Sequence, residues 1–146
     1  MKFFDHSGSY VAAHGVGLAQ GAMEHAINYT KKRKQFGQTI ASFQVTQFKI
    51  AEMATLIEMA RALVQKACSN LDRGNPDTQL SAMAKWWACN VAIKMVDEAL
   101  QLHGGYGYLD DYPIEGFYRA AKILEIYEGM KEIEKMAIGR HLIGKS

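Results

Sequence analysis

The chain has 146 residues, of which 49% are hydrophobic and 22% charged, which is typical of a single globular domain with a sizeable core. A formal net charge of +2 is too small to favour nucleic acid or an anionic membrane surface as a partner. Cys68 and Cys89 lie in helical patterns, which favours reduced thiols, and no apolar run approaches the roughly 18 residues of a membrane span.

Helical periodicity predicts a first long helix over residues 9–32, with Ser7 or Ser9 as its N-cap. Its apolar stripe consists mostly of small residues, which indicates close packing against a neighbour. A second helix is expected from an N-cap at Ser42 to Arg73 or Gly74. The side chains predicted for its buried stripe are Val45, Phe48, Leu56, Ala60, Leu63, Ala67 and Leu71.

A third long helix is expected over residues 78–103, capped by Asp77 or Thr78. Trp86 and Trp87 point in different directions on it, so one of them should reach a second packing surface. Shorter helices are predicted from Pro113 to residue 122 and over residues 130–143. The pattern indicates one all-α domain spanning residues 1–146, an up-down bundle of three long helices with a C-terminal helix pair.

A basic segment follows the first helix and reads Lys31-Lys32-Arg33-Lys34-Gln35-Phe36-Gly37. Cations at the C-terminus of a helix complement its dipole, and this is one interpretation. The other is an anion site, because Arg33 can bind phosphate oxygens with two N–H groups and Phe36 can lie against a flat ring. The segment alone does not decide between them.

The third helix is followed by the glycine-rich run His103-Gly104-Gly105-Tyr106-Gly107. It is not a dinucleotide-binding fingerprint of the βαβ type, because no strand precedes it. Ending a helix needs only one glycine, so the excess indicates a backbone that another group approaches closely.

The run Ile123-Leu124-Glu125-Ile126-Tyr127-Glu128-Gly129-Met130 lies between two helical patterns. Glu128 follows two apolar residues and precedes a glycine that lets the backbone bend. Such a carboxylate suits a general base, although a Glu near a helix start beside a loop glycine has the same local sequence.

Other chemistries lack their motifs. The Glu-x-x-His pairs of di-iron bundles and the ligand spacing of zinc sites are both missing from the sequence, so no metal is predicted. Residues 139–146 match the phosphate-loop pattern Gly-x-x-x-x-Gly-Lys-Ser, but they follow a helix rather than a strand. We therefore interpret that match as chance.

Taken together, four motifs resemble the C-terminal helical domain of acyl-CoA dehydrogenases, in the family's order and spacing. The first is Phe4-Asp5 followed by Gly15-Val16-Gly17-Leu18-Ala19, and the second is Arg33-Lys34-Gln35-Phe36-Gly37 with Phe43-Gln44. The third is Gln101-Leu102-His103-Gly104-Gly105-Tyr106-Gly107, and the fourth is Ile126-Tyr127-Glu128-Gly129. The resemblance covers essentially the whole chain.

The resemblance implies an FAD-dependent α,β-desaturation of an acyl-CoA thioester, an oxidoreductase reaction of fatty acid metabolism. Glu128 would remove the α-proton, while the β-hydrogen passes to the flavin. In this family an N-terminal helical domain and a middle β-domain complete the enzyme, and this chain corresponds to neither. The backbone N–H of the residue at Glu128 is, in the family, one donor to the thioester oxygen.

The resemblance also assigns contacts. Arg33 and Phe36 match positions that contact the FAD of a neighbouring subunit, which implies a homo-oligomer, a dimer or tetramer. The full set expected at FAD is Arg33, Gln35, Phe36, Ile40, Gln44, Gln101, Gly104, Gly105 and Met130, and the set expected at substrate is Asp5, Tyr127 and Gly129. Electron-transfer flavoprotein or a similar acceptor is the expected redox partner, in a bacterial cytoplasm or the mitochondrial matrix.

Three positions depart from the family pattern. Gly8 stands where several relatives carry an Arg near the CoA part of the substrate. Met130 replaces the usual Thr after Glu-Gly, and Glu132 replaces a common Gln. Two other functions stay open, a non-catalytic helical oligomerisation module and an acyl-CoA oxidase-type flavoenzyme that would produce peroxide in air.

Overall fold

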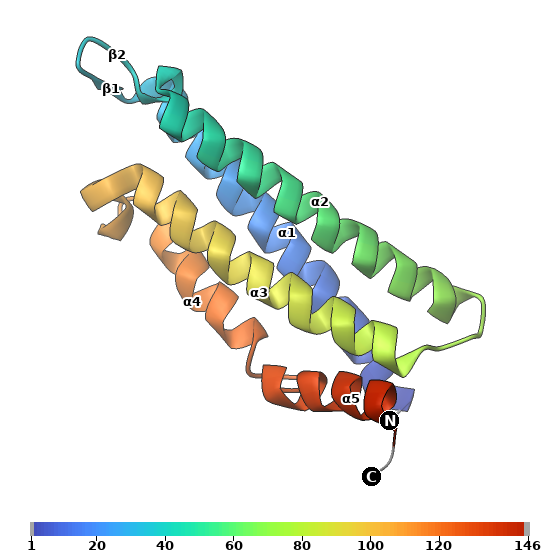
Figure 1. Ribbon diagram of the computed structural model, residues 1–146. Helices are drawn as coiled ribbons and strands as arrows, with labels where there is room; N and C mark the ends of the chain where they lie inside the picture. The colour runs from blue at the N-terminus through green and yellow to red at the C-terminus, as the bar shows by residue number, and fades with distance from the viewer. Residues whose placement is uncertain (1, 145–146) are drawn as a thin grey trace.

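A computed structural model describes the backbone of residues 2–144 and the side chains of residues 6–144. It confirms an all-α bundle of three long helices and a C-terminal helix pair (Figure 1). The elements in chain order are α1 (Lys2–Lys32), β1 (Lys34–Gln35), β2 (Gln38–Thr39), the 3₁₀ helix η1 (Ile40–Ser42), α2 (Gln44–Asp72), α3 (Thr78–His103), the 3₁₀ helix η2 (Gly104–Tyr108), α4 (Ile114–Leu124) and α5 (Lys131–Ile143).

Helix α3 is the centre of the molecule, because it packs against α1, α2, α4 and α5. The three long helices run up, down and up, α4 returns along α3, and α5 lies across the other end of the bundle (Figure 1). This arrangement puts the β1–β2 hairpin and η2 at one end of the bundle. The junction between α4 and α5 lies away from that end.

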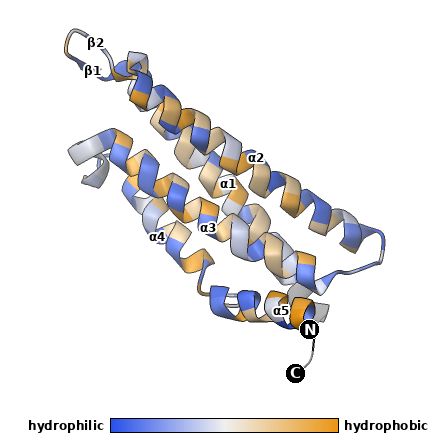
Figure 2. Cartoon of the chain, viewed as in Figure 1, coloured by the Kyte–Doolittle hydropathy of each residue, from blue (hydrophilic) through white to orange (hydrophobic). Residues whose placement is uncertain are grey.

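Small residues set the spacing between α1 and α3, as the sequence predicted. Ala12, Ala19, Ala22 and Ala26 of α1 are fully buried. A Cβ added at Gly15 would stand 3.1 Å from the backbone carbonyl of Ala88, so the two helices touch there through their backbones. Figure 2 shows that each long helix carries both hydrophilic and hydrophobic residues. Helical spacing gathers the hydrophobic ones on the side that faces the core.

Two of the predicted helix boundaries are confirmed by their caps. The Asp77 side chain accepts a hydrogen bond of 2.9 Å from the backbone N–H of Leu80 at the start of α3. Gly74 follows α2 with φ 69°, a left-handed conformation that glycine adopts without a steric penalty. The turn between these residues is hydrophilic (Figure 2).

The predicted N-caps of the first two helices were wrong. Ser7 and Ser9 lie within α1, which already begins at Lys2, so no cap is needed at either serine. Ser42 closes η1, where its hydroxyl donates to the carbonyl of Thr39 at 2.7 Å, and Phe43 is the N-cap of α2. Ser42 therefore ends a short 3₁₀ helix instead of capping α2, which begins at Gln44.

The buried stripe of α2 was only partly predicted. Ala60 and Ala67 are buried, but Val45 and Phe48 are 61% and 58% exposed. Met53, Ile57 and Val64 are the larger side chains that face α1 and α3. At the start of α2 apolar residues occupy two neighbouring faces. Periodicity alone therefore assigned Val45 and Phe48 to the core, although their face points outward.

For the two tryptophans, the prediction that one reaches a second packing surface stays a prediction. Trp86 and Trp87 form an edge-to-face pair with centroids 6.3 Å apart, and both line one shallow apolar groove.

The hairpin formed by β1 and β2 was not predicted at all. Its two central residues, Phe36 and Gly37, have φ values of 52° and 79°, the left-handed pair that tight two-residue hairpin turns require.

Within residues 2–144 no helix is long and apolar enough to span a membrane. The same part of the chain holds no group of three or more His, Cys, Asp or Glu residues that could bind a metal ion. Both cysteines are free thiols. Residues 139–143 of the phosphate-loop match belong to α5, and Gly144 follows its end. Lys145 and Ser146 lie outside the described residues.

Candidate functional site

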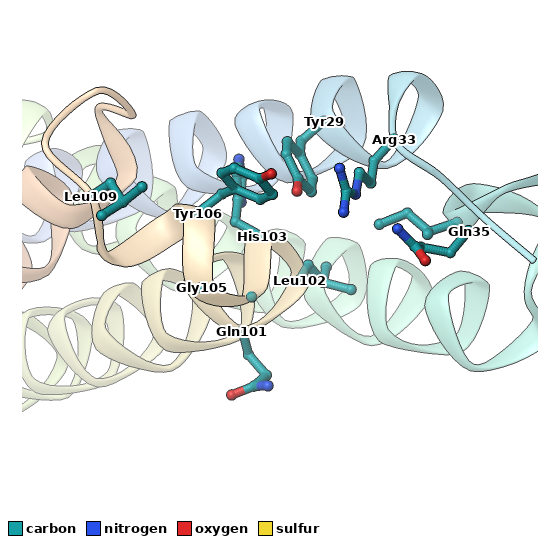
Figure 3. A pocket seen from close by; sticks show the side chains of 11 residues that line it. Tyr29, Arg33, Gln35, Gln101, Leu102, His103, Gly105, Tyr106 and Leu109 are labelled. Atoms are coloured by element: carbon teal, nitrogen blue, oxygen red, sulfur yellow. The ribbon is translucent and has the colours of Figure 1, made fainter.

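A pocket of about 440 Å³ opens at the end of the bundle where α1 and α3 finish. The end of α1, the hairpin and the turn into η2 all contribute to its wall (Figure 3). Its lining residues are Tyr29, Arg33, Gln35, Ile40, Gln101, Leu102, His103, Gly104, Gly105, Tyr106 and Leu109. Its size falls in the range of small-molecule and cofactor sites.

Arg33 is the cation of this pocket. Its backbone N–H donates to the carbonyl of Tyr29 at 2.9 Å, and its carbonyl accepts from Ile40 at 2.9 Å, so the backbone is fixed on both sides. The guanidinium carbon lies 5.0 Å from the centroid of the Tyr106 ring, within the range of a cation–π contact. The guanidinium is thus held in the pocket and keeps N–H donors for an anion (Figure 3).

Aromatic rings form the base of the pocket. The rings of Tyr29 and His103 stack with centroids 4.2 Å apart, and Tyr112 meets both edge-on at 5.9 Å. His103 Nδ1 lies 2.7 Å from the carbonyl oxygen of Ala99, to which a ring N–H donates. Burial lowers the pKa of His103, and nearby His25 lowers it further, against the opposing effect of the Ala99 carbonyl.

Six of the nine residues expected at FAD line this pocket: Arg33, Gln35, Ile40, Gln101, Gly104 and Gly105. The side chain of Gln101 points away from Arg33 and Tyr106 (Figure 3). The other three do not line it. Phe36 is 92% exposed at the hairpin, Gln44 is exposed at the start of α2, and Met130 belongs to the α4–α5 junction.

Tyr29, His103 and Tyr106 are pocket residues that sequence reasoning did not select as site residues. His103 and Tyr106 stood inside the glycine-rich run but were treated as part of a turn. Tyr29 lies one helical turn before Arg33, so its position on the same face of α1 was a usable signal.

Glu128 lies in the junction between α4 and α5 with φ 53°, and only one other non-glycine residue within 2–144 has a positive φ. A left-handed backbone costs an ordinary residue about 1–2 kcal/mol, so surrounding contacts must hold it. One carboxylate oxygen, Oε2, is buried without a hydrogen-bond partner among the described residues. Among the described residues, the other buried side-chain atoms without a hydrogen-bond partner are the hydroxyl oxygens of Ser7 and Ser81. Glu128 is thus the residue with an unpartnered buried carboxylate oxygen.

The ends of this junction are tied by Glu125. Its side chain is 6% exposed, and Oε2 accepts from Lys122 Nζ at 2.8 Å and from Lys131 Nζ at 3.4 Å. The backbone N–H of Lys131 also donates to the Glu125 carbonyl at 3.2 Å. One residue thereby joins the last turn of α4 to the first residue of α5.

The residues next to Glu128 shape the turn. Gly129 has φ 104°, a backbone conformation in which any other residue is strained, and a Cβ there would also meet the Glu134 carboxylate. Tyr127 and Met130 are 37% and 50% exposed on either side. Burial raises the pKa of Tyr127, and the neighbouring Glu128 acts in the same direction.

Asp5, Gly8 and Glu132 complete the predicted set. The Asp5 side chain lies outside the described residues. Gly8 is buried against α3, where an added Cβ would stand 3.8 Å from the Lys85 side chain. Glu132 is exposed in the first turn of α5.

The Arg33 pocket lies where α1 and α3 end, whereas Glu128 lies in the junction between α4 and α5. Within this chain the two sites therefore belong to different parts of the bundle (Figure 1).

Comparisons with known proteins agree with this fold. A family model described as "Acyl-CoA dehydrogenase, C-terminal domain" matches residues 1–143. "Probable acyl-CoA dehydrogenase FadE25" of Mycobacterium tuberculosis is 46% identical over 140 residues, covering 95% of this chain and 36% of that protein. The caffeyl-CoA reductase–Etf complex subunit CarC of Acetobacterium woodii is 42% identical over 145 residues, 99% of this chain and 38% of CarC.

Among solved structures, butyryl-CoA dehydrogenase from Megasphaera elsdenii is similar, with a TM-score of 0.95 and 42% identity over 97% of this chain and 37% of that one. The chain therefore belongs to the acyl-CoA dehydrogenase family and corresponds to its C-terminal domain. It spans between a third and two fifths of the length of these relatives.

The pocket residues suit part of a flavin adenine dinucleotide. The guanidinium of Arg33 can form paired hydrogen bonds to phosphate oxygens. Gly104 and Gly105 have open space where a Cβ would stand, so a ligand can approach that backbone. With a volume of about 440 Å³, the pocket would hold part of a dinucleotide and not the whole molecule.

Proposed function

We propose that this chain is the C-terminal domain of an FAD-dependent acyl-CoA dehydrogenase, in which Glu128 removes the α-proton of an acyl-CoA thioester. The observation that supports this most is the buried, unpartnered carboxylate oxygen of Glu128 on a left-handed backbone. Both features cost stability, and costly local geometry of this kind is concentrated at functional sites. The family supplies the reaction in which such a carboxylate has a use.

The chain's own residues would act as follows. Substrate binding would place the α-carbon at the Glu128 carboxylate and exclude water, which makes the carboxylate a stronger base. The Glu128 backbone N–H would donate to the thioester oxygen and stabilise the charge that develops there. Tyr127 and Gly129 would border the substrate on either side. Bound FAD would supply the oxidant for the β-hydrogen.

FAD contacts would come from the pocket at the other end of the chain. Because Glu128 and Arg33 lie in different parts of the bundle, one copy would use Glu128 on its own flavin and Arg33 on that of a neighbour. This supports a homo-oligomer, a dimer or tetramer, completed by N-terminal and middle domains like those of the relatives. CarC belongs to a complex with Etf, which supports electron-transfer flavoprotein as a partner.

The test is Glu128→Gln in the enzyme assembled with those domains. We expect the variant to retain bound FAD but to lose both desaturation of butyryl-CoA and exchange of its α-protons with deuterated water. Glu115→Gln, which removes a carboxylate from the first turn of α4, is the matched control and should leave both activities unchanged. Proton exchange at the wild-type rate in the Gln variant would assign the base to another residue.

Two other functions predict different results in this experiment. A non-catalytic oligomerisation module would form an oligomer without flavin absorbance even when assembled. An acyl-CoA oxidase-type enzyme would lose turnover in Glu128→Gln as well, but its wild type would release peroxide in air. CarC is named a reductase, so the assay should follow the reaction in both directions.

A further inference from the structure

Lys85 is a buried lysine with no role in the family resemblance. It lies in α3 and is 1% exposed, on a face whose neighbours are Ser81, Ala88 and Cys89. A buried ammonium without hydrogen-bond acceptors would be strongly unfavourable, so its contacts must compensate for lost hydration.

The Lys85 ammonium donates to two backbone carbonyls of the α4–α5 junction. One is the carbonyl of Tyr127, at 2.9 Å, and the other is the carbonyl of Gly129. These two residues lie immediately before and after Glu128. The ammonium of a central helix therefore holds the middle of the turn, while Glu125 ties only its ends.

The direction of the Glu128 backbone N–H follows from this contact. The carbonyl of Tyr127 and the N–H of Glu128 belong to the same peptide unit. Within residues 2–144 every peptide bond is trans, and in a trans peptide the C=O and N–H groups point in opposite directions. Because the carbonyl points at Lys85, the N–H of Glu128 points away from Lys85, toward the opposite side of the turn.

The same peptide unit also carries an electronic effect. A positively charged donor on a carbonyl oxygen polarises the amide and makes its N–H a stronger donor, since hydrogen bonds in a chain reinforce one another. The neighbouring thiol does not compete for the ammonium, because burial raises the pKa of Cys89 to about 11 and the thiol stays neutral.

We infer that Lys85 is a positioning residue for the proposed reaction. It holds residues 127–129 in the left-handed turn and orients and polarises the peptide N–H that Glu128 presents to the thioester oxygen. This inference rests on the proposed role of Glu128. It adds a residue that reaches neither substrate nor cofactor and acts through the backbone of its neighbours.

The first test uses the wild-type 146-residue chain and needs no variant. NMR of lysine ammonium groups should show one signal, from Lys85, that exchanges slowly with water. It should also show coupling across hydrogen bonds to the carbonyl carbons of Tyr127 and Gly129. An ammonium that exchanges as fast as those of the exposed lysines, without such coupling, would overturn the inference.

The second test compares Lys85→Met with Lys94→Met, an exposed lysine of the same helix. In the 146-residue chain, Lys85→Met should speed amide exchange at residues 127–130 by at least about tenfold, the effect of losing one charged hydrogen bond. Exchange within α1 and α2 should stay unchanged, and Lys94→Met should behave as wild type. Unchanged exchange at 127–130 in Lys85→Met would contradict the inference.

The third test measures the thioester itself in the assembled enzyme, with butyryl-CoA carrying ¹³C at the carbonyl. Lys85→Met should shift the bound carbonyl stretch to higher frequency and lower kcat by about 100-fold, as expected for a small misplacement. KM and FAD content should change little. A wild-type stretch and kcat would overturn the inference, whereas α-proton exchange that survives Glu128→Gln would instead overturn the proposed function.

Discussion

The imidazole of His103 stacks on the phenol ring of Tyr29, with centroids 4.2 Å apart and planes inclined by 27°. This contact joins the last residue of α3 to the last turn of α1. Both rings line the pocket that contains Arg33. One wall of the Arg33 pocket is therefore built on a histidine that the folded chain keeps buried.

We predict that His103 makes the chain less stable in mild acid. Burial lowers its pKa below 6.5 in the folded state, so the unfolded chain binds a proton more readily. The free energy of unfolding should therefore be highest above pH 6.5 and fall as the pH drops through that value toward the lower pKa of the folded state. Urea unfolding at a series of pH values measures this.

The control separates His103 from the other histidines. His103→Gln keeps a hydrogen-bond donor for Ala99 and should flatten the pH dependence over that interval. His14→Gln, at an exposed position on α1, should keep the wild-type dependence. Equal slopes in the wild type and His103→Gln would show that another group is responsible.

Glu125→Gln should loosen the α4–α5 junction. Burial alone would raise the pKa of Glu125, but hydrogen bonding and charge from Lys122 and Lys131 outweigh it and lower the pKa below 4.5. The carboxylate thus stabilises the fold above about pH 4.5, and this contribution is lost as the pH falls through the lowered pKa of the folded state.

The neutral amide cannot pair with two ammonium groups, so the variant should lose about 1–2 kcal/mol at pH 7 and show less acid sensitivity. Glu58→Gln removes a carboxylate that pairs with Arg61 on the exposed side of α2, and it should cost less than about 0.5 kcal/mol. Equal losses in the two variants would mean that Glu125 contributes only as a surface charge.

Much of the bundle was predictable because each long helix has its own periodic pattern and clear stop signals, such as Gly74 and Gly104. The exposure of Val45 and Phe48 in α2 was not predictable, because both residues have the helical spacing of a buried stripe. The hairpin was missed because its strands have only two residues each.

The candidate site was predicted only in part. The glycine-rich run and the basic segment are adjacent in space, since α1 and α3 end at the same side of the bundle. Glu128 was singled out because a carboxylate stands beside a glycine in an apolar run, and its catalytic role, which the family resemblance implies, stays a prediction. Lys85 stood in the same kind of setting, a stripe of small residues, but pairing with carbonyls on another segment leaves no pattern in the sequence.

Gly15→Ala should destabilise the chain, although alanine normally favours a helix. The new methyl group would meet the backbone of Ala88 at 3.1 Å, and backbone of a central helix cannot move aside cheaply. We expect a loss of about 1–3 kcal/mol. Gly17→Ala, with nothing within 4 Å of its Cβ, should instead gain up to about 1 kcal/mol. A gain in both variants would refute close packing of α1 on α3.

Arg33 provides the sharpest prediction for the pocket. In the assembled enzyme Arg33→Ala should weaken FAD binding by about 10- to 100-fold, the effect of losing a hydrogen bond between charged groups. Arg33→Lys should recover only part of this, because an ammonium cannot form the paired contact of a guanidinium and stacks less well on Tyr106. Fluorescence of released flavin measures the affinity.

Lys34→Ala is the matched control, because Lys34 is an exposed cation next along the chain that does not line the pocket. If the basic segment only balanced the dipole of α1, Arg33→Ala and Lys34→Ala would have equal and small effects on FAD affinity. A larger effect of Arg33→Ala would instead require a specific contact, since both variants change the net charge equally. The Arg33→Ala loss should also appear when apoenzyme is reconstituted at high salt, where general attraction to anions is screened.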